Sequence, residues 1–209
     1  MAAHNGHLSI VQYLIEQGAD KNKATNDGST PLIIAAFKGD LSMVQYLIEQ
    51  GADKNKADND DSTPLWVAAF KGHLSIVQYL IEHGADKNRA TNDGSTLLCC
   101  AAQNGHLSVV QYLIEQGADK NKATNDCSTP LCMAAQNGHL SIVQYLIEQG
   151  ADKNKATNNG SNSLCFAAQN GHLSILQYLI EQGADKDKAT NDCSTPLCMA
   201  AHNGHLSVV

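Results

Sequence analysis

The sequence predicts an all-α protein, an α-solenoid in which short helical repeats are stacked along the chain. The first observation behind this prediction is a glycine that recurs every 33 residues from end to end, and the second is another glycine with the same period. A fixed period of roughly 20–50 residues is typical of a stacked array rather than of one globular core. The first series is Gly6, Gly39, Gly72, Gly105, Gly138, Gly171 and Gly204, and the second is Gly18, Gly51, Gly84, Gly117, Gly150 and Gly183.

The local chemistry of one repeat, residues 27–59, predicts a turn followed by a short helix. Gly28 allows the positive φ that a tight turn requires. Thr30 is a good helix N-cap, and Pro31 suits the first helical position. The pattern then predicts a helix over residues 32–38, which Gly39 ends in the left-handed conformation.

A second helix is predicted over residues 41–50 of the same repeat. Its apolar residues fall on one face, with Ser42, Gln45 and Glu49 on the opposite one. Isolated helices shorter than about 12–15 residues are marginal in water. Each repeat must therefore bury its apolar face against the repeats before and after it. The apolar residues are Met43, Val44, Leu47 and Ile48.

Three motifs recur in phase with this period: Asp-Gly-x-Thr-Pro-Leu, Ala-Ala-x-x-Gly-His-Leu and Gly-Ala-Asp-x-Asn. In this order and spacing the chain resembles the ankyrin repeat family over all 209 residues. The resemblance implies stacked ankyrin repeats, each a β-turn finger plus two antiparallel helices, in a curved solenoid. It also implies a non-enzymatic protein that binds partner proteins on its concave face.

The repeat phase predicts one array over residues 1–209 with an incomplete repeat at each end. The whole repeats are 27–59, 60–92, 93–125, 126–158 and 159–191, and the partial ones are 1–26 and 192–209. Neither end carries the polar substitutions expected of a capping repeat. We therefore expect a slice of a longer array, or the product of a truncated reading frame, that associates end to end through its uncapped termini.

The net charge of −7 argues against a nucleic-acid footprint, which needs a basic face. No apolar run approaches the roughly 18 residues of a membrane span. We expect a protein partner, with no nucleic acid, membrane, small-molecule substrate, cofactor or metal. Twelve of the 14 basic residues form two columns in the polar segments between repeats. These columns are either a solvated surface or a stripe for an acidic partner.

Variation among the repeats locates a candidate binding face. The second helix barely changes, whereas the turn and the end of the first helix change strongly, and the resemblance places both on the concave face. Phe37 and Phe70 are aromatic anchors flanked by lysines, unless their rings fold onto the neighbouring repeat. Trp66 is expected in the core. The candidate protein-binding residues are Asn26, Asp27, Ser29, Phe37, Lys38, Asp60, Asp61, Ser62, Phe70, Lys71, Gln103, Asn104, Gln136, Asn137, Gln169 and Asn170.

A departure from the family pattern and a local change in one repeat affect expected stability. The histidine that usually follows Thr-Pro-Leu, and which in the family hydrogen-bonds the turn, is absent throughout, which puts the rigidity of the fingers in question. The repeat 159–191 has Asn162-Ser163 where others have Thr-Pro. Loss of the proline costs roughly 0.4–1 kcal/mol through the unfolded state. We predict that this repeat opens first among the five whole ones.

Seven cysteines raise the question of a disulfide or metal site. Four of them, Cys99, Cys132, Cys165 and Cys198, lie one repeat apart. Stacked helices sit about 8–10 Å apart, beyond the roughly 7 Å that a disulfide bridges. The sequence favours buried thiols in a reducing, cytoplasmic compartment. No catalytic set stands outside the repeat phase. The hypotheses are a protein-binding scaffold, a spacer within a larger protein, and a cysteine-based redox or metal module.

Overall fold

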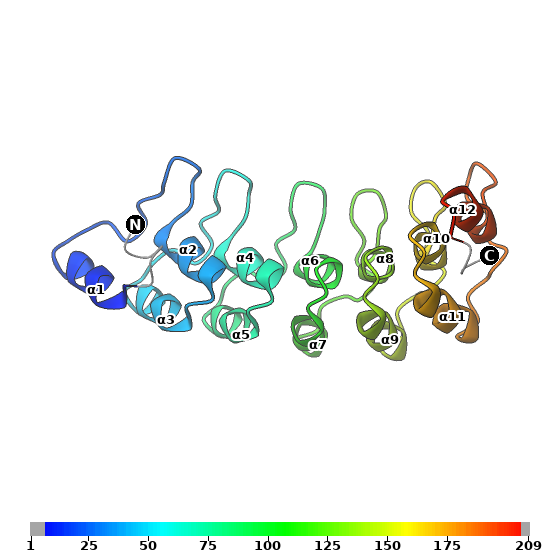
Figure 1. Cartoon of the computed structure of the whole chain (residues 1–209). Coiled ribbons are helices and arrows are strands. Elements are labelled where there is room, and N and C mark those ends of the chain that lie inside the picture. The colour runs from blue at the N-terminus through cyan, green and yellow to red at the C-terminus, as the bar shows by residue number, and fades with distance from the viewer. Residues whose placement is uncertain (1–6, 206–209) are drawn as a thin grey trace. The chain divides into compact units, whose positions relative to one another are not determined.

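A computed structural model describes residues 7–205 of the chain, which divides into two compact bodies. The N-terminal body is Met1–Asn92 and the C-terminal body is Asp93–Val209. The described residues form twelve α-helices and no strand (Figure 1). None of these helices is long and apolar enough to cross a membrane.

Each body repeats a pair of short helices. In the N-terminal body the helices are α1 (Leu8–Glu16), α2 (Pro31–Lys38), α3 (Leu41–Glu49), α4 (Pro64–Lys71) and α5 (Leu74–Glu82). In the C-terminal body they are α6 (Leu97–Gln103), α7 (Leu107–Glu115), α8 (Pro130–Gln136), α9 (Leu140–Glu148), α10 (Ser163–Gln169), α11 (Leu173–Glu181) and α12 (Pro196–His202).

Helices of the same kind stack on one another within each body. The first helices of successive repeats pack together, α2 on α4 in one body and α6 on α8 on α10 on α12 in the other. The first helices α2, α4, α6, α8 and α10 also pack on the second helix of their own repeat, as α2 does on α3. Within each body Figure 1 shows the hairpin fingers projecting away from the second helices. This arrangement leaves the ends of the first helices beside the fingers.

The helix limits follow from the predicted start and stop signals. The Thr30 hydroxyl accepts a hydrogen bond from the Ile33 N–H at 3.3 Å, and Pro31 opens α2. Gly39 ends α2 at φ 76°, in the left-handed region. The second helix of this repeat ends at Glu49, one residue before the predicted limit.

The core is formed by small and apolar side chains at positions that recur with the 33-residue period. Leu32, Ala35 and Ala36 of α2 are buried, and Met43, Val44 and Leu47 of α3 are fully enclosed. Ile48, predicted on the same apolar face, is partly exposed. Burial of a Leu, Val or Met side chain contributes about 1.5–3 kcal/mol, so the stacked faces hold each repeat in place.

Candidate functional site

Each finger is a turn fixed by its own short polar side chains. In the first finger the Gly28 N–H donates to the Thr25 carbonyl at 3.0 Å, and the Thr25 N–H donates to the Ser29 carbonyl at 3.0 Å. The Asp27 carboxylate accepts hydrogen bonds from the hydroxyls of Thr25 and Ser29, and these lower the pKa of Asp27. The candidate residues Asp27 and Ser29 therefore build the turn in addition to lying on its surface.

The position of Gly28, at the end of this turn, has a left-handed conformation in every finger of the described residues. Gly28 has φ 85°, as predicted for a turn glycine. Asp61, Cys127 and Cys193 replace glycine at the same position and keep φ between 63° and 64°. A non-glycine residue there costs about 1–2 kcal/mol. The N–H of each of these three residues donates to the carbonyl three residues earlier, which closes the turn in this conformation.

Asparagines join each finger to the next one within a body. The Asn59 main-chain N–H donates to the Asp27 carbonyl at 3.1 Å, and its Nδ2 donates to the Asn26 carbonyl at 3.1 Å. In the C-terminal body the Asn158 and Asn191 side chains make the equivalent bonds one repeat apart, at 3.1 and 2.9 Å. These bonds link neighbouring fingers laterally without the histidine that is absent here.

The missing histidine has a partial substitute in the C-terminal body. Cys99 stands at the position of the missing histidine. The Cys99 Sγ accepts a hydrogen bond from the Thr96 hydroxyl at 3.4 Å. The Cys99 thiol in turn donates to the Lys122 carbonyl at 3.7 Å, in the segment that leads to the next finger. A thiol is a weak donor, so the asparagine bonds carry more of the link between fingers.

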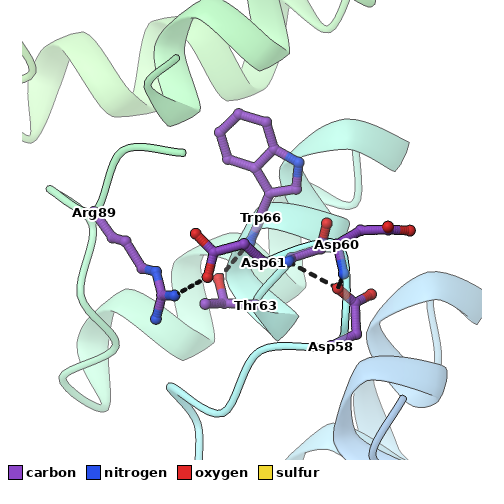
Figure 2. A network of polar contacts seen from close by, with 7 residues as sticks. Asp58, Asp60, Asp61, Thr63, Trp66 and Arg89 are labelled. Carbon is purple, nitrogen blue, oxygen red and sulfur yellow. Dashed lines mark hydrogen bonds and ion pairs between the residues drawn. The ribbon is translucent and has the colours of Figure 1, made fainter. Parts of the chain in front are cut away.

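One finger of the N-terminal body carries three acidic residues and an ion pair (Figure 2). The Asp58 carboxylate accepts the N–H groups of Asp60 and Ser62, at 3.0 and 2.8 Å. The Asp61 carboxylate pairs with the guanidinium of Arg89, which lies near the end of the same repeat, 60–92. Asp61 is therefore paired with a cation, whereas Asp60 is exposed and forms no ion pair with another residue of 7–205.

The Trp66 side chain lies beside this finger rather than in the core. In Figure 2 its ring points away from the turn, and the residue is partly exposed. Ile33, at the same position one repeat earlier, is buried. Trp66 is therefore less enclosed than Ile33, and its predicted position in the core is met only in part.

The ends of the first helices are held by histidines of the following repeat. The Nε2–H of His73 donates to the Phe37 carbonyl at 3.3 Å. In the C-terminal body His139, His172 and His205 donate to the carbonyls of Gln103, Gln136 and Gln169, each at 3.0 Å. The candidate residues at these positions therefore have a backbone fixed by the neighbouring repeat.

Aromatic and cationic side chains meet at the helix ends of the N-terminal body. Phe37 and Phe70 are 48% and 45% exposed, so neither ring is folded into the core. The Lys71 Nζ lies 4.2 Å from the centroid of the Phe37 ring and 5.5 Å from that of the Phe70 ring. Both separations are within the roughly 6 Å of a cation–π interaction. We call Phe37, Lys38, Phe70 and Lys71 the Phe–Lys cluster.

The corresponding ends of α6, α8 and α10 in the C-terminal body carry uncharged glutamine and asparagine. The Nδ2 of Asn104 donates to the Cys100 carbonyl at 2.8 Å, four residues earlier in the same helix. Asn137 and Asn170 make the same bond, each at 2.9 Å. These candidate asparagines cap their own helices, whereas the adjacent glutamines leave their side chains exposed.

A hollow of about 680 Å³ lies in the C-terminal body between the last fingers and helices α10 and α12. Polar residues of the fingers form one wall, and helix residues form the other. Its lining shows that fingers and first helices border a common space, as the candidate face requires. The lining residues are Asn159, Ser161, Gln169, Thr190, Asn191, Asp192, Ser194, Cys198, Met199, His202 and Asn203.

All seven cysteines are free thiols. Burial raises the pKa of the Cys100 thiol to about 12 and also raises the pKa values of Cys99, Cys132 and Cys165. At residues 7–205 no three His, Cys, Asp or Glu side chains are grouped so that they could hold a metal ion. The sequence analysis did not find the Arg89–Asp61 pair, although Arg89 is the only arginine and Asp61 one of three departures from the turn glycine.

Comparison with known proteins identifies the architecture. A family model described as ankyrin repeats (3 copies) matches residues 1–91, 51–124, 86–158 and 131–209. The crystal structure of the human ASB11 ankyrin repeat domain is similar, with a TM-score of 0.88 and 24% sequence identity over 95% of this chain and 89% of that chain. No curated protein matches the chain. These findings confirm the predicted resemblance and the fold of stacked helical repeats.

Proposed function

This chain belongs to the ankyrin repeat family, and from that premise we propose that it is a non-enzymatic scaffold that binds a partner protein. Ankyrin repeats are in general modules of protein–protein interaction. We place the binding face on the concave side formed by the fingers and the ends of the first helices.

The observation that carries this proposal is the exposure of Phe37 and Phe70 on an otherwise repetitive scaffold. Both rings stand at positions that vary between repeats, next to core positions that do not. Aromatic residues with a nearby cation are typical of the few contacts that dominate interface energies. The hollow beside α10 and α12 supports the same face, because the same two rows of positions line it.

The face can be tested by affinity capture with matched variants. The test variant combines Phe37→Gln and Phe70→Gln. Glutamine stands at the equivalent position of the next repeat, Gln103, so the fold should tolerate both changes. The control is Glu49→Gln with Glu82→Gln, at exposed positions on the second helices. We expect to capture a partner protein that binds the purified chain directly. It should still bind the control variant but should not bind the phenylalanine variant. A direct partner that binds both variants equally would contradict this face.

Two further parts of the proposal concern setting and assembly. Buried free thiols suit a reducing compartment, so we place the chain in the cytoplasm. Ile10, Leu14 and Leu197 are 48%, 45% and 57% exposed, so we propose that these surfaces drive end-to-end self-association of the polypeptide. Light scattering over a concentration series checks this, and a constant monomer mass at high concentration would contradict it.

A further inference from the structure

We propose that the Phe–Lys cluster recognises a partner segment in which an acidic side chain adjoins an apolar one. The inference rests on the proposed scaffold function and adds the chemistry of the partner. It concerns the N-terminal body alone, because all four residues of the cluster lie within it.

The first step is the geometry of the cation. Phe37 belongs to α2, whereas Phe70 and Lys71 belong to α4, so the Lys71 ammonium lies beside rings from two successive repeats. These interactions hold the ammonium and both rings near one another before any partner arrives. Such pre-organisation lowers the entropy cost of ordering the side chains on binding.

The second step is the charge that remains available. No carboxylate of the described residues forms an ion pair with Lys38 or Lys71. The nearest acidic residue in the sequence, Asp40, uses its carboxylate to accept the Met43 N–H at 3.0 Å. The cluster therefore presents two ammonium groups without an acidic partner among the described residues, beside two rings of which about half is exposed.

The third step concerns the sign of the partner's charge. An aromatic pair next to acidic fingers could instead receive a cation from the partner. Here Lys71 already lies beside both rings, and Lys38 stands on the adjacent helix end, so an incoming cation meets two like charges. Of the finger acids, Asp61 is paired with Arg89, Asp27 and Asp58 are hydrogen-bonded within their own turns, and Asp60 is exposed. An incoming carboxylate, in contrast, gains a charge-assisted hydrogen bond to an ammonium.

The chain supplies its own comparison for this surface. At the equivalent positions of α6, α8 and α10 in the C-terminal body stand glutamine and asparagine, which are uncharged and not aromatic. The variant pairs Phe37→Gln with Phe70→Gln and Lys38→Asn with Lys71→Asn thus install residues that these repeats accept elsewhere. Circular dichroism and thermal melting of each purified variant establish that it is folded.

The test is selection of a random displayed peptide library on the immobilised full chain. We expect enriched peptides to carry Asp or Glu next to an apolar residue, and to lose enrichment on either variant pair. For a synthesised peptide from this selection, Lys71→Gln should weaken binding about tenfold, the loss expected for one hydrogen bond to a charged group. Raising the salt concentration should reduce that difference.

The other outcomes are distinguishable. Enrichment of Lys or Arg, or of acidic peptides that bind both variant pairs as well as the original chain, would overturn the inference. Some peptides could bind both cluster variants as well as the original chain but fail to bind the Gln136→Ala, Gln169→Ala variant. That result would overturn the inference about the cluster while supporting the scaffold function. If no peptide is enriched over the bare support, the scaffold function and this inference both fail.

Discussion

The imidazole of His73 lies directly over Gly39 of the preceding repeat. A Cβ built on Gly39 would stand 2.7 Å from the His73 Cε1, closer than real Cβ contacts come. The same imidazole donates to the Phe37 carbonyl, two residues before that glycine. The glycine is needed both for its φ of 76° and for the space that the next repeat's histidine occupies.

Gly39→Ala should therefore destabilise the chain more than the same change at a glycine with open space. Gly117 is the matched control, because its φ is 82° and no atom lies within 4 Å of the place that a Cβ would take there. Both changes add left-handed strain of about 1–2 kcal/mol, but only Gly39→Ala also displaces His73. Urea midpoints measure the difference. Equal midpoints for the two variants would contradict the role of the imidazole.

The repeat 159–191 should open first among the whole repeats. Asn162 caps α10 by accepting the Cys165 N–H at 3.0 Å, yet its fully buried Nδ2 has no hydrogen-bond partner. Such an orphaned group costs about 1–3 kcal/mol. The Ser163 hydroxyl recovers one bond, to the Lys153 carbonyl at 3.1 Å.

Asn162→Thr removes the unpaired amide and keeps the cap that Thr129 provides in α8, so it should stabilise the chain by about 1 kcal/mol. Hydrogen exchange should show the amides of α10 among the faster ones in the original chain and slowed in the variant. Amides of α10 that exchange among the slowest in the original chain would refute the prediction.

Asp61→Gly should have an effect that depends on salt. Glycine relieves the left-handed strain at φ 63°, but the change also removes the ion pair with Arg89. Exposed pairs of this kind contribute about 0–1 kcal/mol and are weakened by salt. We expect a small change in thermal midpoint at low salt and a clear increase at high salt. An increase of equal size at both would show that the pair contributes nothing.

The thiols should differ sharply in reactivity. Cys193 and Cys198 are exposed, and the Thr195 hydroxyl lowers the pKa of the Cys198 thiol, which favours the reactive thiolate. Cys100 is buried with a pKa of about 12. Brief maleimide treatment at neutral pH, followed by peptide mass spectrometry, should label Cys193 and Cys198 first and Cys100 last. Rapid labelling of Cys100 would contradict the buried position.

The raised pKa of Cys100 also predicts how the stability of the fold changes at alkaline pH. The unfolded thiol ionises near pH 9, whereas the folded one stays protonated to about pH 12. The free energy of unfolding should therefore fall as the pH rises through this window, because the unfolded state loses its proton first. Cys100→Ala should make that fall shallower in urea titrations at several pH values, and an unchanged slope would refute it.

Local signals in the sequence were sufficient for the helix starts and stops. Thr30 and Gly39 act through atoms within four residues of themselves, so their roles can be predicted without knowing the packing. The contacts between repeats are different. A period of 33 places equivalent residues side by side, yet His73 reaches the Phe37 carbonyl 36 residues back. Within a single repeat, Arg89 reaches back 28 residues to Asp61. These offsets depend on the register and tilt of the stacked helices, which periodicity does not specify.

The same limit applies to the candidate site. Variation between repeats predicted which positions face outward, and Phe37 and Phe70 are indeed half exposed. It did not predict that Lys71 lies beside both of their rings, or that Asn104 turns back to cap its own helix, since both depend on rotamers. Residue type alone is a poor guide to which polar side chains remain available.

The asparagine bonds between fingers have a mechanical consequence. The side chains of Asn158 and Asn191 each donate to the carbonyl of the asparagine 33 residues earlier. When the chain is stretched, these hydrogen bonds should therefore break one after another. Stretching in an optical trap should then lengthen the tether in equal steps, each near the contour of a single period, roughly 110 Å at about 3.3–3.6 Å per residue.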